Sequence, residues 1–399
     1  MILLAVLLPS GCSSSRNSPS GQPPLIRVKL LSNVDQALVT ANAPPVVRAQ
    51  SDAGAHEMAF PAGRAVGIVL ASDGMWRIGN VPAGSGELWI QPAPGDNIQI
   101  NGQPYRGLYR LVPVSTGKFD VINDVDLDSY LKGVLSAELF PRWHIEAYKA
   151  QAIAARTYAL FHAKTDGANR NFDVYSDTRS QVYGGISAET DKSRQATEDT
   201  AGVVLAYGPP GDEHIFETYF SACCGGISQS GYDALGAPNI EPLMAQNVGT
   251  MCNASPKFNW GPIVIAKTEL TRRIKTWGAR KDNPIKDMGQ LERIDIYLVN
   301  QYRRPVRFLI TDNRGMSYSL SSEQTRQACN ADAGDGPTLP SSFCNPVSEQ
   351  DTIAFVEGHG SGHGVGLCQL CTEARAEQGM SAEQILAAAF PKSVLKRAY

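Results

Sequence analysis

Residues 133–159 read GVLSAELFPRWHIEAYKAQAIAARTYA, and this stretch decides how the 399-residue chain is interpreted. Residues 127–137 predict a helix that Pro141 interrupts, because proline has no backbone N–H for the helix ladder. Residues 144–163 predict a second, longer helix with seven alanines, spaced so that small side chains recur along one face. An Ala-rich face lets a sheet or another helix approach closely.

The regions on either side of this stretch differ in pattern. Residues 25–120 combine short alternating apolar runs with many turn residues, which predicts a β-rich N-terminal part. Residues 121–399 mix strand patterns with helices expected at 188–200, 266–277 and 381–389, the second of them stopped by Gly278. Ser381, with Glu383 or Gln384 near the third position, predicts a capping-box start for the last helix. The predicted class is α+β: a β-rich mixed domain with an Ala-rich helix at about 144–163.

Composition indicates a folded protein and argues against one class of partner. Apolar residues make up 43% of the chain and charged residues 19%, and the length allows a sizeable core. The formal net charge is -3, and the sequence has no long basic run. Nucleic acid is therefore not an expected partner.

The first twelve residues, MILLAVLLPSGC, resemble a bacterial lipoprotein signal, in which Cys12 becomes the lipid-carrying residue. Pro9 and the lack of a preceding Lys or Arg depart from that pattern, so a cleaved secretory signal or a plain tail stays open. Residues 13–24 are rich in Ser and Pro and predict a flexible tether. We expect an exported protein anchored to a membrane through Cys12.

Seven cysteines remain after Cys12, and in an exported protein disulfides are more common than metal ligands. Residues 328–345 form a Gly-, Ser- and Pro-rich excursion bounded by Cys329 and Cys344. A disulfide between these two would close a loop of about 15 residues and contribute roughly 3 kcal/mol. Because seven is odd, at least one thiol stays unpaired.

Glu138 is the candidate for chemistry in the opening stretch. It stands between Ala137 and the sequence Leu-Phe-Pro, directly before the long helix. A carboxyl group among apolar neighbours can be a surface or capping residue. It can also be a general acid, because apolar surroundings raise a carboxyl pKa toward neutrality.

The opening stretch resembles the signature of the stage II sporulation protein D (SpoIID/LytB) family. Further segments resemble other family motifs in the same order, from about residue 105 to the end: residues 121–134, 177–185, 200–205, 220–226, 362–369 and 376–379. The resemblance implies an exported peptidoglycan enzyme with a glycan cleft, in which Glu138 is the catalytic acid. It places the anchored protein at the cell wall, in the periplasm or on the outer cell surface.

The implied reaction is lytic transglycosylation of glycan strands, preferably strands without stem peptides. A hydrolase commonly uses two carboxylates, whereas this reaction uses the sugar's own 6-hydroxyl and needs one. No second carboxylate stands in a comparable motif, and Glu146 is expected to be structural or solvated. The alternative is a non-catalytic glycan-binding module that activates an N-acetylmuramoyl-L-alanine amidase, and a wall amidase is an expected partner in either case.

Polar residues inside the family motifs are candidate glycan contacts. For some of them a structural role is an equal alternative. Gln151 and Arg156 can form hydrogen bonds that hold the long helix in place. Tyr183 can pack in the core, and His363 can support neighbouring loops. The candidates are Gln151, Arg156, Gln181, Tyr183, Ser221, His363 and Gln369.

Residues 358–371, GHGSGHGVGLCQLC, suggest a metal site, a redox site or a tight turn. The family resemblance implies a turn that lines the cleft, because glycine permits positive φ and close backbone approach. Some relatives carry a zinc motif His-x5-Cys-x5-Cys, but Thr218 and Ser230 occupy its outer positions around Cys224. No cofactor is therefore expected, although a different zinc site with Cys224, Cys252 and Cys368 stays open.

The same resemblance implies further disulfides. Cys223 and Cys371 both stand where the family usually has another residue, which suggests a bridge between them. Cys224 is a candidate to pair with Cys252 or with Cys368. These alternatives are not separable at the level of the sequence.

Overall fold

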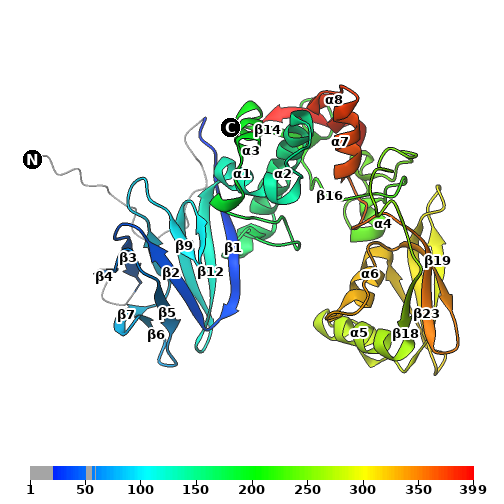
Figure 1. Cartoon of the computed structure of the whole chain (residues 1–399), viewed down its shortest axis with the longest axis horizontal. Coiled ribbons are helices and arrows are strands. Elements are labelled where there is room, and N and C mark those ends of the chain that lie inside the picture. Colours follow the sequence, from blue (N-terminus) through cyan, green and yellow to red (C-terminus); the bar gives the residue numbers. More distant parts are fainter. Residues whose placement is uncertain (1–20, 51–55, 59) are drawn as a thin grey trace, which may run out of the picture. The chain divides into compact units, whose positions relative to one another are not determined.

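The computed structural model describes residues 21–50, 56–58 and 60–399, and the chain divides into two compact units (Figure 1). Unit 1 takes Met1–Val134, Ala163–Ala188 and Arg397–Tyr399, and unit 2 takes Leu135–His162 and Glu189–Lys396. Helix α1 (Leu127–Glu138) begins in unit 1 and ends in unit 2. The predicted α+β class is confirmed. The predicted signal, with Cys12, lies outside the described residues.

Unit 1 is built from short strands, as the alternating pattern predicts. Its strands are β1 (Leu25–Val34), β2 (Gln36–Ala41), β3 (Val46–Ala49), β4 (His56–Met58), β5 (Val66–Leu70), β6 (Met75–Ile78), β7 (Val81–Ser85), β8 (Leu88–Gln91), β9 (Ile98–Ile100), β10 (Gln103–Tyr105), β11 (Leu108–Ser115), β12 (Lys118–Asp126) and β13 (Val174–Tyr175). Two 3-10 turns follow α2 within the same unit, at Asp166–Asn169 and Ile186–Ala188.

These strands form two sheets that share one apolar core. The first has the order β13-β1-β12-β11-β8-β3-β4 and the second β10-β9-β2-β5-β6-β7. Strand β5 alternates buried and half-buried side chains along its length, as expected for a strand with one face in a core. Trp76 is fully buried in this core, with its ring edge-to-face on Phe119 at 5.0 Å. Its indole N–H donates to the Gly86 carbonyl at 2.7 Å, so burial leaves the N–H paired.

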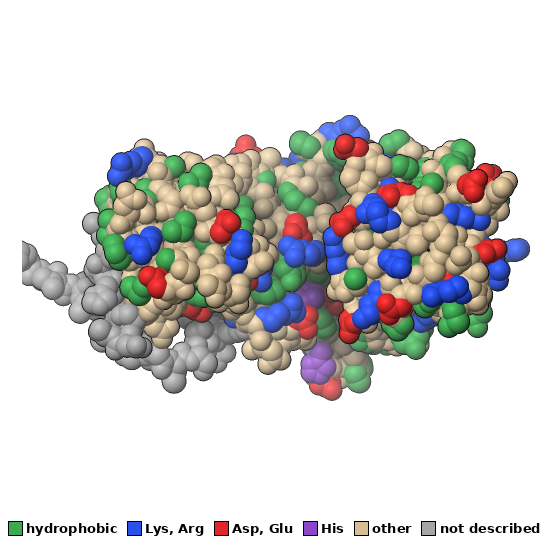
Figure 2. Space-filling model, turned by 90° about the horizontal axis from the view of Figure 1, so that it is seen from below, with side chains coloured by type: hydrophobic (Ala, Val, Ile, Leu, Met, Phe, Trp, Pro, Cys, Tyr) green, Lys and Arg blue, Asp and Glu red, His purple; other side chains and the backbone are tan. Residues whose placement is uncertain are grey.

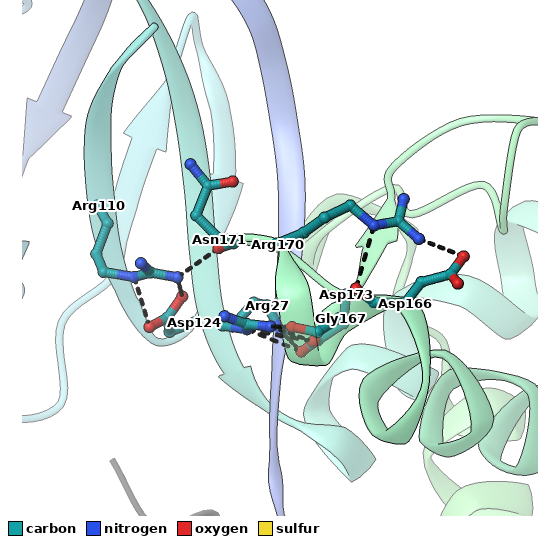
Figure 3. A network of polar contacts seen from close by, with 8 residues as sticks. All are labelled: Arg27, Arg110, Asp124, Asp166, Gly167, Arg170, Asn171 and Asp173. Carbon is teal, nitrogen blue, oxygen red and sulfur yellow. Dashed lines mark hydrogen bonds and ion pairs between the residues drawn. The ribbon is translucent and has the colours of Figure 1, made fainter. Parts of the chain in front are cut away.

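A network of charged side chains attaches the late segment 163–188 to the first strand of unit 1 (Figure 3). The Arg27 guanidinium lies 2.6 Å from Asp173 Oδ1, and Asp173 Oδ2 accepts the Arg27 backbone N–H at 2.8 Å. Arg27 also donates to the Gly167 carbonyl. Next to it, Arg110 Nε donates to Asp124 at 2.9 Å. The ion pairs fix β13, which pairs in parallel with β1.

Unit 2 carries most of the helices. Its helices are α2 (Ile145–Lys164, which ends in unit 1), α3 (Asp191–Asp199), α4 (Gly231–Leu235), α5 (Lys267–Arg280), α6 (Ser322–Asn330), α7 (Gln369–Glu377) and α8 (Ala382–Ala389). Its strands are β14 (Val203–Tyr207), β15 (His214–Ile215), β16 (Phe220–Ser221), β17 (Asn259–Trp260), β18 (Ile263–Ala266), β19 (Leu291–Val299), β20 (Pro305–Asp312), β21 (Ser317–Ser321), β22 (Phe343–Ser348), β23 (Thr352–His359), β24 (Leu367–Cys368) and β25 (Val394–Arg397).

Helix α2 is buried on more sides than the single predicted face. Ala147, Ala150 and Ala154 pack in a core with residues of α7 and α8, whereas Tyr148 and Ala152 belong to a second apolar cluster. Small side chains on several faces let neighbouring elements approach the helix axis from different directions. Glu146, at its first turn, accepts the N–H of Ala382 at the start of α8, 2.8 Å away, which agrees with a structural role.

A separate α/β layer of unit 2 holds α5 and α6 beside the strands β18, β19 and β23 (Figure 1). The prediction that Gly278 stops α5 is wrong, because the helix continues to Arg280. Gly278 serves close packing instead: a Cβ there would lie 2.7 Å from the Lys286 backbone nitrogen. The excursion 328–345 is more regular than expected, since Cys329 lies in the last turn of α6 and Cys344 lies in β22.

The capping-box start predicted for the C-terminal helix is confirmed, with Ser381 and Gln384 bonding each other's backbone N–H. Acidic and basic side chains are interspersed over the face seen in Figure 2. Among the residues described, none of the helices combines the length and the apolarity needed to cross a bilayer.

Candidate active site

Glu138 is the last residue of α1, and its side chain is partly buried. The helix starts at a side-chain cap, since Asp126 accepts the Ser129 N–H at 2.8 Å. It ends just before Pro141, as the sequence predicts. Next to Glu138, Leu139 is buried, whereas Phe140 is 57% exposed. Glu138 is therefore followed by one buried and one exposed apolar side chain.

Gln369 is the residue that the structure brings to Glu138. It is the first residue of α7, it is buried, and its Nε2 donates to Glu138 Oε2 at 3.2 Å across 231 positions of sequence. The sequence predicts both as site residues but does not predict this contact. An amide does not titrate, so Gln369 can hold the carboxyl group in place while that group gains or loses a proton.

The loop from Glu138 to the start of α2 is fixed at several points within unit 2. Lys192 Nζ donates to the Pro141 carbonyl at 2.7 Å and to the Trp143 carbonyl at 2.5 Å. The Tyr148 hydroxyl donates to the Phe140 carbonyl at 3.2 Å. Because these side chains donate to the backbone carbonyls of the loop, they fix the position of the Glu138 carboxyl group before substrate binds.

Glu373 helps to hold the start of α2 next to the site, and the sequence analysis does not identify it. Its carboxylate oxygens accept the His144 backbone N–H at 2.9 and 3.1 Å, at the N-terminus of α2, where unpaired N–H groups need acceptors. Burial is the main cause that raises the pKa of Glu373. Its spacing in the sequence could have indicated this role, because Glu373 lies one helical turn after Gln369 on the same face of α7.

The glycine-rich stretch is a tight backbone turn, as predicted. Gly360, Gly362, Gly364 and Gly366 all have positive φ, between 68° and 91°. At Gly366 a Cβ would lie 2.3 Å from the Tyr219 carbonyl oxygen, so a larger residue does not fit there. The turn leads directly into β24 and α7, and so it sets where Gln369 begins.

His363 lies inside this turn and is half-buried. Its Nδ1 accepts the Val365 N–H at 3.0 Å, and its carbonyl accepts from Arg304 at 3.3 Å. Burial lowers its pKa, which favours the neutral imidazole. These contacts support the loop-holding role among the two roles expected for this residue.

Two further candidates are buried polar side chains of unit 2 without hydrogen-bond partners among the described residues. Gln151 is fully buried in α2, and within residues 21–50, 56–58 and 60–399 neither its Oε1 nor its Nε2 has a hydrogen bond. Ser221 is buried in β16, which pairs in parallel with β24, and its Oγ has no partner in the same part of the chain. Unpaired buried polar groups are costly, so both positions retain a capacity to bind a polar ligand or water.

The remaining candidates are built into the interior. Arg156 is fully buried and donates to the carbonyls of Thr197 and Val203, both at 3.2 Å, which supports its structural alternative. In unit 1, Gln181 accepts the Tyr130 hydroxyl at 3.0 Å. Tyr183 is buried with its ring centroid 4.9 Å from that of Tyr130, which supports core packing.

The seven described cysteines are free thiols in this structure, and all are buried. Cys329 and Cys344, the Cys329/Cys344 pair from here on, lie in the apolar core of the α5–α6 layer. The other five gather near the start of α7. Four of them have mutually adjacent Sγ atoms and are named here the four-cysteine cluster: Cys224, Cys252, Cys368 and Cys371. The predicted disulfides stay predictions.

Comparison with known proteins connects this geometry to a family. The family model described as SpoIID, stage II sporulation protein, matches residues 115–207, a range that includes Glu138. An uncharacterised protein of Brachyspira hyodysenteriae is 29% identical over 274 residues, 69% of this chain and 67% of that protein. A Bacillus subtilis (strain 168) protein named amidase enhancer is 25% identical over 300 residues, 66% of this chain but 40% of its own length.

Proposed function

This chain belongs to the SpoIID family, and from that premise we propose that it acts on the peptidoglycan of a bacterial cell wall. The reaction we propose is lytic transglycosylation of glycan strands, preferably those without stem peptides, with Glu138 as the single acid and base. One observation carries the proposal. Glu138 lies inside the matched region, partly buried, and is hydrogen-bonded by Gln369 at 3.2 Å.

The reaction needs one proton-transfer group that works twice. Protonated Glu138 gives its proton to the glycosidic oxygen as the bond from that oxygen to C1 of the muramic acid breaks, and the bonding electrons stay on the oxygen. The carboxylate then takes the proton of the 6-hydroxyl of the same sugar, whose oxygen bonds to C1. The product ends in a 1,6-anhydro ring, no water is consumed, and Glu138 is protonated again. A second carboxylate, which many glycosidases need, has no step to perform.

The surroundings of Glu138 fit this double role. Gln369 holds one carboxylate oxygen without exchanging protons, and the ties from Lys192 and Tyr148 fix the loop that follows. Phe140, the exposed aromatic residue of that loop, offers a flat apolar surface of the kind that packs against a sugar ring.

A second candidate function rests on the relative named amidase enhancer. In this case the chain binds glycan without cleaving it and activates a wall amidase. The two candidates differ in what Glu138 does: it transfers protons in the first and at most contacts the sugar in the second. An amidase is a proposed partner in both, because strands without stem peptides are amidase products.

The proposed location is the outer side of a membrane, with a lipid anchor on Cys12 holding the protein at the wall. Labelling of cells with a clickable fatty acid should mark the full chain, and Cys12→Ala should remove the label. A labelled variant, or an unlabelled native chain, would refute the anchor and leave the proposed reaction untouched.

The reaction is tested with purified glycan strands stripped of stem peptides. The full chain is incubated with these strands, and mass spectrometry looks for 1,6-anhydromuramic ends. We expect these ends from the native chain, and a loss of at least about 100-fold in Glu138→Gln, in line with the contribution of a general acid. Glu383→Gln, at an exposed position on α8, is the matched control and should cleave normally.

Three outcomes separate the candidates. Reducing ends without anhydro rings would replace transglycosylation by hydrolysis. Glycan binding without cleavage by the native chain, together with stimulation of a purified amidase, would establish the activator. Equal cleavage by the native chain and Glu138→Gln would remove Glu138 from the mechanism.

A further inference from the structure

The four-cysteine cluster has the dimensions of a metal site. Cys224 Sγ lies 3.7 Å from Cys252 Sγ and 3.8 Å from Cys371 Sγ, and all four sulfur atoms lie within 4.8 Å of one another. Four sulfurs bound to zinc at about 2.3 Å in a tetrahedron are about 3.8 Å apart. A disulfide bond is much shorter, at about 2.05 Å. The spacing therefore fits four ligands around one ion.

The four ligands come from three separate segments of unit 2. Cys224 follows β16, Cys252 lies in a turn, and Cys368 and Cys371 form a Cys-x-x-Cys pair where α7 begins. Cys368 is the N-cap of α7, and its Sγ accepts two backbone N–H groups, from Cys224 at 3.3 Å and from Cys371 at 3.4 Å. Hydrogen bonds of this kind orient a cysteine sulfur and fix its position, as the outer contacts of a metal ligand do.

A buried cation lies next to the cluster. Arg304 is buried, and its guanidinium donates to the carbonyls of Cys224, at 2.9 Å, and of Ile227 and His363. These partners are neutral. The Glu323 carboxylate also attracts the Arg304 charge electrostatically. However, this carboxylate already accepts a hydrogen bond from Arg326 at 2.6 Å. A zinc ion with four thiolates carries a net charge of about -2, which would compensate the buried guanidinium.

A small pocket adjoins the cluster. It is lined by Cys224, Cys368 and Cys371 together with Ser228, Gln246 and Arg375. A metal site in a folded protein needs an entry path, and this pocket borders three of the four ligands.

We propose that Cys224, Cys252, Cys368 and Cys371 bind one structural Zn²⁺ ion. The site is closed, because four protein ligands complete the tetrahedron and all four side chains are buried, so it has no open position for catalysis. Its ligand set differs from the His-x5-Cys-x5-Cys motif, whose outer positions here are Thr218 and Ser230. The ion anchors the start of α7, and Gln369 lies between two of its ligands in the sequence.

The test measures metal and thiols on the full chain, purified under mild reduction with zinc in the growth medium. We expect about one zinc ion per chain by elemental mass spectrometry, retained through gel filtration. Replacement by Co²⁺ should give the visible bands of tetrahedral thiolate coordination. Cys252→Ser should lose at least nine-tenths of the metal. Cys223→Ser is the matched control: this thiol is in the same group of five, but it is outside the four that can share an ion, so the metal should stay.

The outcomes decide between an ion and disulfides. Substoichiometric metal in the native chain, with masses four hydrogens lower than the fully reduced chain in the peptides of the cluster, would overturn the proposal in favour of two disulfides. Four free, alkylatable thiols without metal would also overturn it. Cys371→His, which keeps a zinc ligand, guards against misfolding and should retain zinc. Because the readout is metal content, a failure here leaves the proposed reaction intact, and a failure of glycan cleavage leaves the metal site intact.

Discussion

The four-cysteine cluster and the Cys329/Cys344 pair show how surroundings decide the chemistry of equally buried thiols. Cys329 and Cys344 lie among apolar side chains such as Leu270 and Phe355, and burial raises the pKa of Cys329 to about 12. Burial raises the pKa of Cys344 as well. In the four-cysteine cluster the sulfur of Cys368 accepts two N–H groups, and Arg304 lies next to the cluster. The first environment favours the neutral thiol, whereas the second brings four sulfur atoms together in an arrangement that fits one metal ion.

The largest expected effect is on the four-cysteine cluster. Cys252→Ser should lower the free energy of unfolding by more than about 4 kcal/mol, because structural zinc contributes about 10–16 kcal/mol of binding free energy in small zinc domains. Chemical denaturation of the native chain and the variant, with and without a chelator, measures the difference. The variant should no longer respond to the chelator. A decrease in the free energy of unfolding of less than about 1 kcal/mol is typical of a surface substitution. That result would mean that the four-cysteine cluster contributes no more to stability than the Cys329/Cys344 pair does as free thiols.

A disulfide between Cys329 and Cys344 would give the next largest effect. We expect the non-thiol reductant tris(2-carboxyethyl)phosphine to lower the unfolding free energy of the oxidised chain by roughly 3 kcal/mol, from the loss of a loop closure of about 15 residues. The double variant Cys329→Ala, Cys344→Ala should not respond to the reductant. Metal content, followed in the same samples, should not change. An insensitive native chain would show that this pair stays reduced.

In the reduced chain, the raised pKa of Cys329 predicts a smaller, pH-dependent effect. The native thiol keeps its proton up to about pH 12, whereas the unfolded chain loses it near 9.0. The stability that this thiol contributes is complete below pH 9 and is lost as the pH rises toward 12, about 1.4 kcal/mol of it between pH 8 and pH 10. Denaturation at both pH values should show a shallower decline for Cys329→Ala than for the native chain. Parallel declines would contradict the predicted shift.

The smallest effect is expected at Cys223, which borders the four-cysteine cluster without belonging to it. Its Sγ lies 4.0 Å from the Cys252 carbonyl oxygen, a weak contact whose loss removes little stability. Cys223→Ser should therefore change the unfolding free energy by less than about 1 kcal/mol and leave the metal content unchanged. A loss as large as that of Cys252→Ser would place Cys223 among the ligands and would remove the distinction on which the cluster is defined.

The sequence predicts the individual helices and turns of the site better than it predicts which of them come into contact in the fold. The end of α1 before Pro141 and the cap at Ser381 follow from local chemistry, and both are confirmed. The hydrogen bond between Gln369 and Glu138, and the meeting of Cys252 with Cys368, depend on chain paths that no local pattern encodes. The Gly278 prediction was wrong for a related reason: its role is set by the packing of Lys286 from a later turn, not by helix propensity.

The ion pair between Arg27 and Asp173 has a consequence for the order in which the chain folds. During synthesis, β1 leaves the ribosome long before β13, its parallel partner, which the pair fixes in place. The interval from Val34 to Tyr175 takes roughly 7–28 s at typical elongation rates of about 5–20 residues per second. Throughout that time one edge of β1 presents unpaired N–H and C=O groups, the kind of edge that attracts strands of other chains. A holding chaperone that binds nascent chains would have its target in this interval.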